Sequence, residues 1–377
     1  MDDFVQGTRM QATDFDTRSW MVDLFDGRGE IALGDLIIPG SHDSDTSVVV
    51  TEKGPDQGCS QLVVEGEIAS PVGKCAIAKL TKTQDRSIDK QLADGIRYFD
   101  LRVGVAPNKG AYKGASDRER LVTQHTLVLE PLVDTMGKIL AFSSQHPKEQ
   151  VIIHFQKLQF PTNRDRWLKV FNDVLHEKRD GGPSVCERAW TEEAISVEDA
   201  ALKTVTLDQA WGAGLSYPVL VADDQVVRLK EIAAAHEAGC YRNANMALAT
   251  PWPQADNDVP KIIQIGQKYL TDRQALLKDG GPGCDIEEEN WCGFFVSQLQ
   301  SKPPDLQYAA CVAKTEPGCS ILEQATKTNP TTIDAFITWV GQGLPANIAI
   351  VDYYNHPSGV DYAKRLITLN TRSRTSR

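Results

Sequence analysis

Residues 83–103 read TQDRSIDKQLADGIRYFDLRV. The apolar residues of Ile88–Ala93 recur at helical spacing, and Arg97–Val103 is an apolar run of strand length. A short helix that leads into a strand ending in polar residues is typical of a chain in which helices and strands alternate.

The same alternation extends over the whole chain. Seven further segments have the length and composition of strands: Asp35–Ile38, Leu121–His125, Gln150–Gln156, Val205–Leu207, Val219–Ala222, Gly293–Gln298 and Asn347–Tyr353. Helical spacing recurs between them, in Leu132–Ser144, Arg164–Glu177, Val226–Ala238, Lys261–Leu277 and Ile333–Gly341. Eight strands alternating with helices predict an α/β fold, a (β/α)8 TIM-type barrel. Val205–Leu207 is the weakest strand, and its loss would leave the barrel irregular.

The chain has 377 residues, of which 41% are hydrophobic and 24% charged. These values are those of a soluble globular protein, and no linker divides the chain. We therefore expect a single domain over residues 1–377, with a catalytic core at about 30–371 and a basic tail at 372–377. Long loop insertions are expected at Thr46–Thr83, Gly181–Ala200 and Gln300–Pro330.

The formal net charge is -11. Nucleic-acid binding normally needs a basic surface, so no nucleic-acid partner is expected. No stretch reaches the roughly 20 apolar residues of a membrane-spanning helix, so any membrane contact should be peripheral. We expect a monomer.

The eight cysteines form an even set with local spacing. Cys284 and Cys292 lie eight residues apart, as do Cys311 and Cys319, which favours short disulfides within loops. Cys59 with Cys75, and Cys186 with Cys240, would complete the set. The chain contains no CxxC pair, so zinc binding is not favoured. Disulfides favour a secreted, extracellular protein, although no signal peptide is present in this numbering.

Polar residues close several of the predicted strands: His42, Asp43, Asp100, Arg102, His125 and Asp352. In a βα barrel the site lies at the carboxyl ends of the strands, and closure places the last strand beside the first. Asp352 could then orient His42. Two histidines with an arginine between them provide a base, an acid and a fixed positive charge for displacement at phosphorus.

Each of these residues also has a purely structural interpretation. A single histidine at a strand end is commonly a satisfied structural side chain, Asp100 and Arg102 could form an ion pair, and Asp352 could cap a helix. The complete set is much harder to explain by chance. His154 and Gln156 lie two positions apart in a strand, so alternation should direct both toward the barrel interior.

Four segments resemble a known family: IPGSHDSDT at 38–46, the block at 83–103, LVTQHTLVL at 121–129 and HPKEQVIIHFQK at 146–157. They are similar to the catalytic X-type domain of phosphatidylinositol-specific phospholipases C, especially the small bacterial metal-independent enzymes. NIAIVDYYNHPSGVDYAKRLITLN at 347–370 resembles the closing strand and helix of that family.

The resemblance implies that the partner is a phospholipid or a soluble phosphodiester substrate, and it implies a role for each residue of the set. His42 would remove the proton from the inositol 2-hydroxyl, with Asp352 holding His42, and the alkoxide would attack phosphorus to give a cyclic phosphate and diacylglycerol. His125 would protonate the leaving oxygen, Asp43 would support this acid, and Arg102 would neutralise the phosphate.

Metal-dependent relatives place an acidic ligand where Arg102 stands, so the resemblance implies no cofactor and no metal. Calcium remains a possibility that is not favoured, because Asp43, Asp45 and Asp100 offer oxygen ligands.

The chain departs from the family pattern at four places. Asp45 and Thr126 replace usual glycines, Gln156 or Lys157 stands in place of a strand lysine, and Asp223 with Asp224 replaces a common arginine. We expect Lys157, Gln156, His154 and Asp223 to contact the substrate, and the head group could differ from inositol.

Two other functions stay open. One is a metal-dependent glycerophosphodiesterase or sphingomyelinase-D-like barrel, although Arg102 interrupts the acidic pair that such a site needs. The other is a catalytically inactive barrel that binds a lipid or its head group.

Overall fold

The computed structural model describes residues 15–48, 77–160, 162–179, 181–191, 193–222, 225–226, 228–229, 240–255, 258–279, 284–301, 320–356 and 361–372. Within these residues, no helix combines the length and the apolar composition that crossing a membrane requires.

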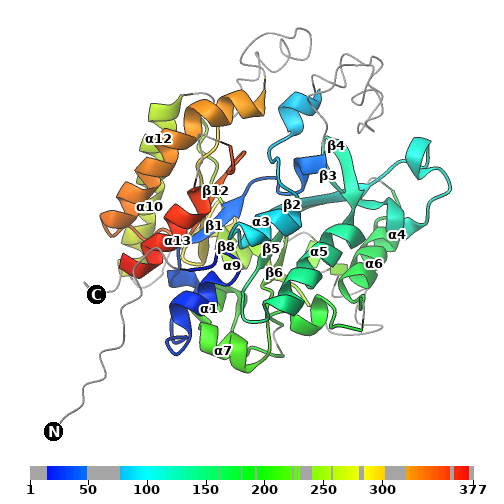
Figure 1. The fold of residues 1–377 in the computed structure, drawn as a ribbon, viewed down its shortest axis with the longest axis horizontal. Coiled ribbons are helices and arrows are strands. Elements are labelled where there is room, and N and C mark those ends of the chain that lie inside the picture. Colours follow the sequence, from blue (N-terminus) through cyan, green and yellow to red (C-terminus); the bar gives the residue numbers. More distant parts are fainter. Residues whose placement is uncertain are drawn as a thin grey trace.

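Eight parallel strands form one curled sheet, in the order β7-β6-β5-β2-β1-β12-β11-β8 (Figure 1). Their bounds are Arg242–Asn243, Val219–Val221, Ile152–Gln159, Tyr98–Val105, Ile38–Ser41, Ile348–Val351, Phe294–Gln298 and Leu248–Ala249. No described residues pair β7 with β8, so the barrel is irregular and open between these strands. The predicted α/β barrel is confirmed.

The strand at Leu121–His125 has the predicted bounds but a different place. It is β3, which pairs antiparallel with β2 and with β4 (Leu127–Pro131) and lies off the parallel sheet. β2 has eight residues, more than its partner β1, and its outer half carries this hairpin. The prediction of a third barrel strand here was wrong.

Val205–Leu207 is not a strand. Val205 follows the short helix η6 (Asp199–Thr204) as its C-cap, and Leu207 begins α7 (Leu207–Gly212). Thr206 and Gln209 form a reciprocal capping box, in which each side chain bonds to the backbone N–H of the other. This pattern starts a helix and overrides the short apolar run. The barrel strands that the sequence did not indicate are β7 and β8, of two residues each.

Helices cover the outside of the sheet. They include α1 (Trp20–Phe25), α3 (Ile88–Ala93), α5 (Leu132–Gln145), α6 (Arg164–Leu175), α10 (Val259–Lys278), α12 (Ile321–Gly341) and α13 (Tyr362–Arg372). Figure 1 shows α10, α12 and α13 side by side on one flank. α12 begins twelve residues before the predicted Ile333 and contains Pro330, so the end of the predicted loop Gln300–Pro330 is helical. The predicted helix Val226–Ala238 lies mostly outside the described residues.

The centre of the sheet is tightly packed around β1. Gly40 pairs with Ile350 of β12 on one side and with Tyr98 of β2 on the other. A Cβ at Gly40 would lie 2.8 Å from the Ile350 side chain and 2.9 Å from the Tyr98 ring. Only glycine allows this close approach, and the approach brings the residues that follow β1, β2 and β12 together.

Two disulfides join described residues, Cys186–Cys240 and Cys284–Cys292. Both pairs agree with the predicted pairing. Cys59, Cys75, Cys311 and Cys319 lie outside the described residues.

Candidate active site

His42 and Asp352 lie at the carboxyl ends of neighbouring strands. Ser41 of β1 pairs with Val351 of β12, so the residues that follow them become neighbours. His42 Nδ1 lies 2.8 Å from Asp352 Oδ1, and both side chains are buried. Asn329 Nδ2 of α12 donates to the backbone carbonyl of Asp352 at 2.7 Å. The carboxylate therefore fixes the orientation of the imidazole from a backbone that is itself held.

The loop after β1 is held by the first residues of the block at 83–103. Thr83 Oγ1 lies 3.1 Å from the carbonyl oxygen of His42 and 2.9 Å from that of Asp43. Gln84 Nε2 donates to the carbonyls of His42 and Val351 at 3.1 and 2.9 Å. Asp43 has a φ of +39°, in the left-handed region. These contacts hold a backbone conformation that a residue with a Cβ seldom adopts.

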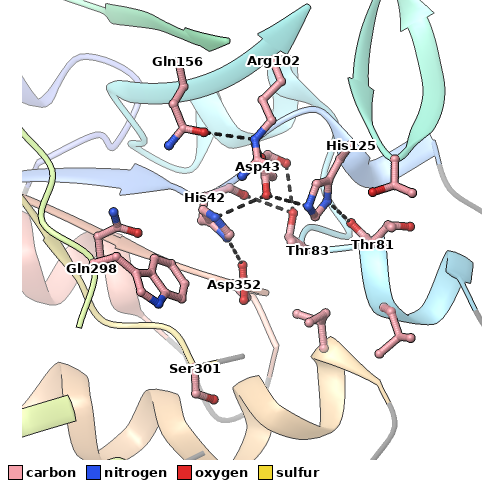
Figure 2. A pocket seen from close by; sticks show the side chains of 14 residues that line it. His42, Asp43, Thr81, Thr83, Arg102, His125, Gln156, Gln298, Ser301 and Asp352 are labelled. Carbon is pink, nitrogen blue, oxygen red and sulfur yellow. Dashed lines mark hydrogen bonds and ion pairs between the residues drawn. The ribbon is translucent and has the colours of Figure 1, made fainter. Parts of the chain in front are cut away.

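The Asp43 carboxylate connects three cationic or potentially cationic groups (Figure 2). Its Oδ2 lies 3.2 Å from His42 Nε2 and 3.0 Å from His125 Nε2, and its Oδ1 lies 2.8 Å from Arg102 Nε. The reactive nitrogens of both histidines thus converge on one oxygen. Their ring centroids are 6.4 Å apart, with an interplanar angle of 71°.

His125 is oriented through its other nitrogen. Its Nδ1 lies 2.7 Å from the backbone carbonyl of Thr81, which therefore accepts a hydrogen bond from Nδ1–H. This contact leaves Nε2 directed toward Asp43 and the cleft. Thr126, the next residue, has a φ of +60°. A β-branched residue in this conformation is strained, and such strain is characteristic of functional sites.

Arg102 and Gln156 meet above the cleft. Arg102 Nε donates to Gln156 Oε1 at 3.0 Å and forms the ion pair with Asp43. The pairing of β2 with β5 shifts here, because Leu101 pairs with Phe155 but Arg102 pairs with Lys157. Gln156 is the extra residue of this bulge. Within the described residues, the terminal guanidinium nitrogens of Arg102 have no hydrogen-bond partner.

The predicted substrate-contacting residues have different positions. Gln156 lines the cleft, whereas Lys157 is exposed and does not line it. His154 is buried in the barrel, where its Nδ1 lies 2.7 Å from the hydroxyl of Tyr98. Burial lowers the pKa of His154 to about 4. Asp223 and Asp224 lie outside the described residues.

The cleft has a volume of about 390 Å³. Besides the histidines and their partners, it is lined by Leu80, Thr81, Trp252, Gln298, Ser301 and Ile321. The ring of Trp252 lies 5.8 Å from that of His42, centroid to centroid. The sequence alone did not assign any of these six residues to the site. A cleft of this size accommodates a small polar head group.

The histidines have opposite pKa shifts. Burial lowers the pKa of His42, but the carboxylates of Asp43 and Asp352 outweigh burial and raise it to about 9. Burial also lowers the pKa of His125, and here Asp43 does not compensate because Arg102 and His42 oppose it. Burial would raise the pKa of Asp43, yet the two histidines and Arg102 keep it below its ordinary value.

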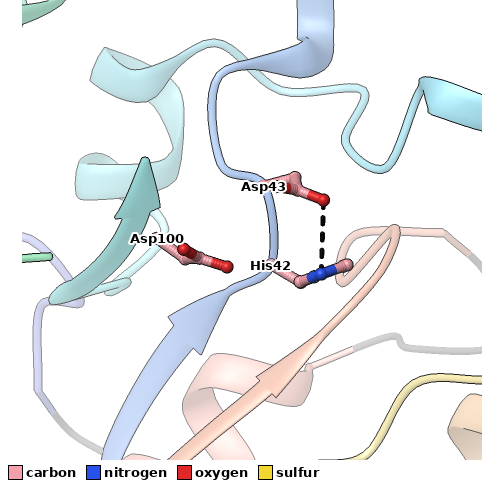
Figure 3. Close-up of side chains that lie close together, drawn as sticks. All are labelled: His42, Asp43 and Asp100. Carbon is pink, nitrogen blue, oxygen red and sulfur yellow. Dashed lines mark ion pairs between the residues drawn. The ribbon is translucent and has the colours of Figure 1, made fainter. Parts of the chain in front are cut away.

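Figure 3 shows the residues that could provide metal ligands, His42, Asp43 and Asp100. One atom from each lies within 4.8 Å of the others. Calcium takes about six to eight oxygen ligands, and both nitrogens of His42 already face carboxylates. Burial and the Asp43 carboxylate raise the pKa of Asp100 to about 6. The described residues therefore fit a calcium ion poorly, and Arg102 already places a positive charge beside Asp43.

Comparisons with known proteins agree with this geometry. No family model matches the chain. The human PI-PLC X domain-containing protein 3 is 27% identical over 289 residues, which are 75% of this chain and 74% of that relative. The mouse PI-PLC X domain-containing protein 2 is 39% identical over 139 residues, but the match covers only 36% of this chain and 38% of that relative.

A solved structure has the same fold. The phosphatidylinositol-specific phospholipase C from Listeria monocytogenes superposes with a TM-score of 0.57 and 16% identity. The superposition covers 94% of this chain and 99% of that one.

Proposed function

We propose that this chain, which belongs to the PI-PLC X-domain family, is a phosphodiesterase that cleaves a phosphatidylinositol-like phosphodiester by intramolecular attack. One observation carries the proposal. The Nε2 atoms of His42 and His125 converge on a single carboxylate oxygen, at 3.2 and 3.0 Å, in a cleft beside Arg102. This places two proton-transfer groups and a cation within the span of one phosphodiester.

His42 acts as the base. Its Nε2 removes the proton from the hydroxyl next to the phosphorylated carbon of the head group, and the resulting oxygen attacks phosphorus. Asp352 holds Nδ1 at 2.8 Å, so it keeps the ring oriented and stabilises the imidazolium that forms.

His125 acts as the acid. Its Nε2 donates a proton to the leaving oxygen of the lipid as the phosphorus–oxygen bond breaks, which gives diacylglycerol and a cyclic phosphate. In its neutral form His125 can then activate a water molecule that opens the cyclic phosphate. The Thr81 carbonyl keeps the same nitrogen directed at the reaction in both steps.

The pKa values require a transfer of one proton before the reaction. In the unliganded protein the raised pKa of His42 keeps it protonated at neutral pH, while the lowered pKa of His125 favours its neutral form. Catalysis needs the opposite distribution. Asp43 Oδ2 is within hydrogen-bonding reach of both Nε2 atoms, so it can pass the proton from His42 to His125.

Arg102 provides the positive charge. Its Nε is held by Asp43 and Gln156, which leaves its terminal nitrogens for the phosphate oxygens. A guanidinium can give two charge-assisted hydrogen bonds that strengthen as charge develops in the transition state. We therefore propose that the reaction needs no metal. The interruption of the acidic cluster by Arg102 also disfavours the glycerophosphodiesterase and sphingomyelinase-D alternatives.

The two disulfides support an oxidising compartment, and we propose that the protein is secreted and meets its lipid at a membrane surface. Gln156 lines the cleft with an uncharged amide, which suits the hydroxyl groups of a polyol head group.

Incubation of the protein with phosphatidylinositol vesicles and with other glycerophospholipids, in the presence of a chelator, tests this function. We expect release of diacylglycerol from phosphatidylinositol and no release by His42→Ala or His125→Ala. A protein that binds these vesicles but releases no diacylglycerol from any of them would be the inactive binding barrel instead.

A further inference from the structure

Asp45 is a buried carboxyl group that the proposed mechanism does not use. It follows β1, three residues after His42, and is 2% exposed. Its Oδ2 accepts hydrogen bonds from Thr123 Oγ1 and Thr135 Oγ1, both at 2.7 Å. One carboxylate oxygen thus joins three separate parts of the chain.

The two threonines belong to the elements that surround His125. Thr123 lies in β3, two positions before His125, so the two residues share one face of the strand. Thr135 lies in the first turn of α5, the helix that follows the β3–β4 hairpin. Asp45 therefore connects the loop that carries His42 and Asp43 to the hairpin that carries His125.

The backbone pairing of the hairpin with the parallel sheet ends before His125. β2 pairs with β3 at Val103–Thr123, Gly104–Val122 and Val105–Leu121, and the pairing stops there. His125 therefore lies two residues beyond the last position that the parallel sheet fixes. Its distance from His42 depends on side-chain contacts, which include those of His125 itself with Thr81 and Asp43. The bond from Thr123 to Asp45 is another, and it ties β3 to the loop that carries His42.

The surroundings of Asp45 are specific for a hydrogen-bond acceptor. A second carboxylate, that of Glu130 in β4, accepts a hydrogen bond from Thr135 at 3.2 Å. Glu130 also forms an ion pair with Lys138 of α5, which balances its charge. The hydroxyls of both threonines are buried. Without an acceptor at position 45 each would keep only a longer contact with Glu130, at 3.3 Å for Thr123 and 3.2 Å for Thr135. A glycine, which is usual at this position in the resembling family, could not form either bond.

We propose that Asp45 is a positioning residue that holds the general acid His125 at its working distance from His42 and Asp43. This inference rests on the proposed function, because it assigns Asp45 to the acid half of that reaction. Asp45 itself does not touch the substrate.

The test uses the leaving group of the substrate. Asp45→Ala and Thr123→Val should each lower kcat for phosphatidylinositol about 10- to 100-fold, since small misplacements of a catalytic group have effects of this size. With an aryl phosphodiester of the same head group, whose leaving oxygen needs little protonation, both variants should lose less than about threefold. Asp45→Asn keeps an acceptor oxygen and should stay close to the wild type with both substrates.

Thr332→Val is the matched control. Thr332 is also buried, and its hydroxyl donates to a backbone carbonyl within α12, away from the hairpin. We expect this variant to retain wild-type kcat on both substrates. Equal losses for phosphatidylinositol and the aryl substrate in Asp45→Ala and Thr123→Val would overturn the proposal, as would no loss at all.

A second measurement separates this inference from the proposed function. NMR of the histidine side chains follows the contact between His125 and Asp43 without turnover. Asp45→Ala and Thr123→Val should shift the ring signals of His125 while those of His176 stay unchanged. Failure of the wild type to cleave any substrate would refute the proposed function, whereas unchanged His125 signals in both folded variants would refute the positioning role.

Discussion

The side chains of His42 and Asp352 meet at 2.8 Å, although the residues are 310 positions apart in the sequence. The contact follows from the parallel register of β1 and β12, in which Ser41 lies opposite Val351. Its electrostatic consequence is large. Burial lowers the pKa of His42, but Asp43 and Asp352 together reverse this and raise it to about 9.

Asp352→Asn should therefore change the pH dependence of the reaction. For the wild type we expect a bell-shaped profile of kcat/KM, because the active protein holds one proton between His42 and His125. Its alkaline limb should lie near pH 9, where His42 loses that proton. Asparagine removes one of the charges that raise this pKa, so the alkaline limb should move to lower pH. The profile of kcat/KM against pH checks this, and an unmoved alkaline limb would show that Asp352 does not set the pKa of His42.

His42→Ala and His125→Ala should each lower kcat by about 100- to 10,000-fold, because each removes one proton-transfer group. A substrate with a leaving group of low pKa should partly restore the His125 variant, since its leaving oxygen needs no proton. The same substrate should not restore the His42 variant. Equal recovery of both variants would contradict these roles.

Arg102→Lys should reduce kcat strongly with a smaller change in KM. Lysine keeps the charge but loses the planar fork that bonds two phosphate oxygens at once. Steady-state kinetics on phosphatidylinositol vesicles in chelator measures both constants. If the wild type itself were inactive in chelator and recovered with calcium, Arg102 would not be the group that supplies the positive charge at the phosphate.

Asp45→Asn should alter the pH dependence of stability. Burial and the nearby Glu130 carboxylate raise the pKa of Asp45 from 3.8 to about 7. Because this pKa is higher in the folded than in the unfolded protein, the contribution of Asp45 to stability is fully present below about pH 4 and is lost as the pH rises through 7. Asparagine stays neutral, so the variant should gain stability relative to the wild type between pH 4 and 7.

Urea unfolding at several pH values measures this difference. Asp89→Asn, at an exposed position of α3, is the control for the same substitution at a carboxyl group that is not buried. A constant difference between Asp45→Asn and the wild type would contradict the raised pKa.

The two described disulfides should both be oxidised in the native protein. Loss of Cys284–Cys292, which closes a short loop, should cost about 2 to 3 kcal/mol of unfolding free energy, and loss of Cys186–Cys240 about 4 kcal/mol, because its loop is longer. Intact-mass analysis without reduction and urea unfolding of the cysteine-to-serine variants check these values. Free thiols at all four positions would contradict the secreted assignment.

Most of the candidate site could be predicted from the sequence, because one rule about parallel strands was enough to group its residues. Residues at the carboxyl ends of parallel strands share one edge, and this rule brings His42, Arg102 and Asp352 together. His125 was found with them, although its strand is part of an antiparallel hairpin. The resemblance to the family compensated for the wrong strand topology.

Other features had no readable signal. Trp252 follows β8, whose two residues are too few to show a pattern. Thr81 acts through its backbone carbonyl, which any residue could supply. The alternation in β5 suggested that His154 and Gln156 point the same way, but the bulge opposite Leu101 and Arg102 places only Gln156 at the cleft.

The most direct test of the proposed reaction is the identity of the first phosphorus-containing product. Phosphatidylinositol is incubated with the wild-type protein in chelator, and the water-soluble products are followed by phosphorus NMR. Intramolecular attack predicts that a five-membered cyclic phosphate appears first and that any acyclic phosphate appears later, at its expense. An acyclic phosphate formed from the start, with no cyclic product at any time, would contradict the account.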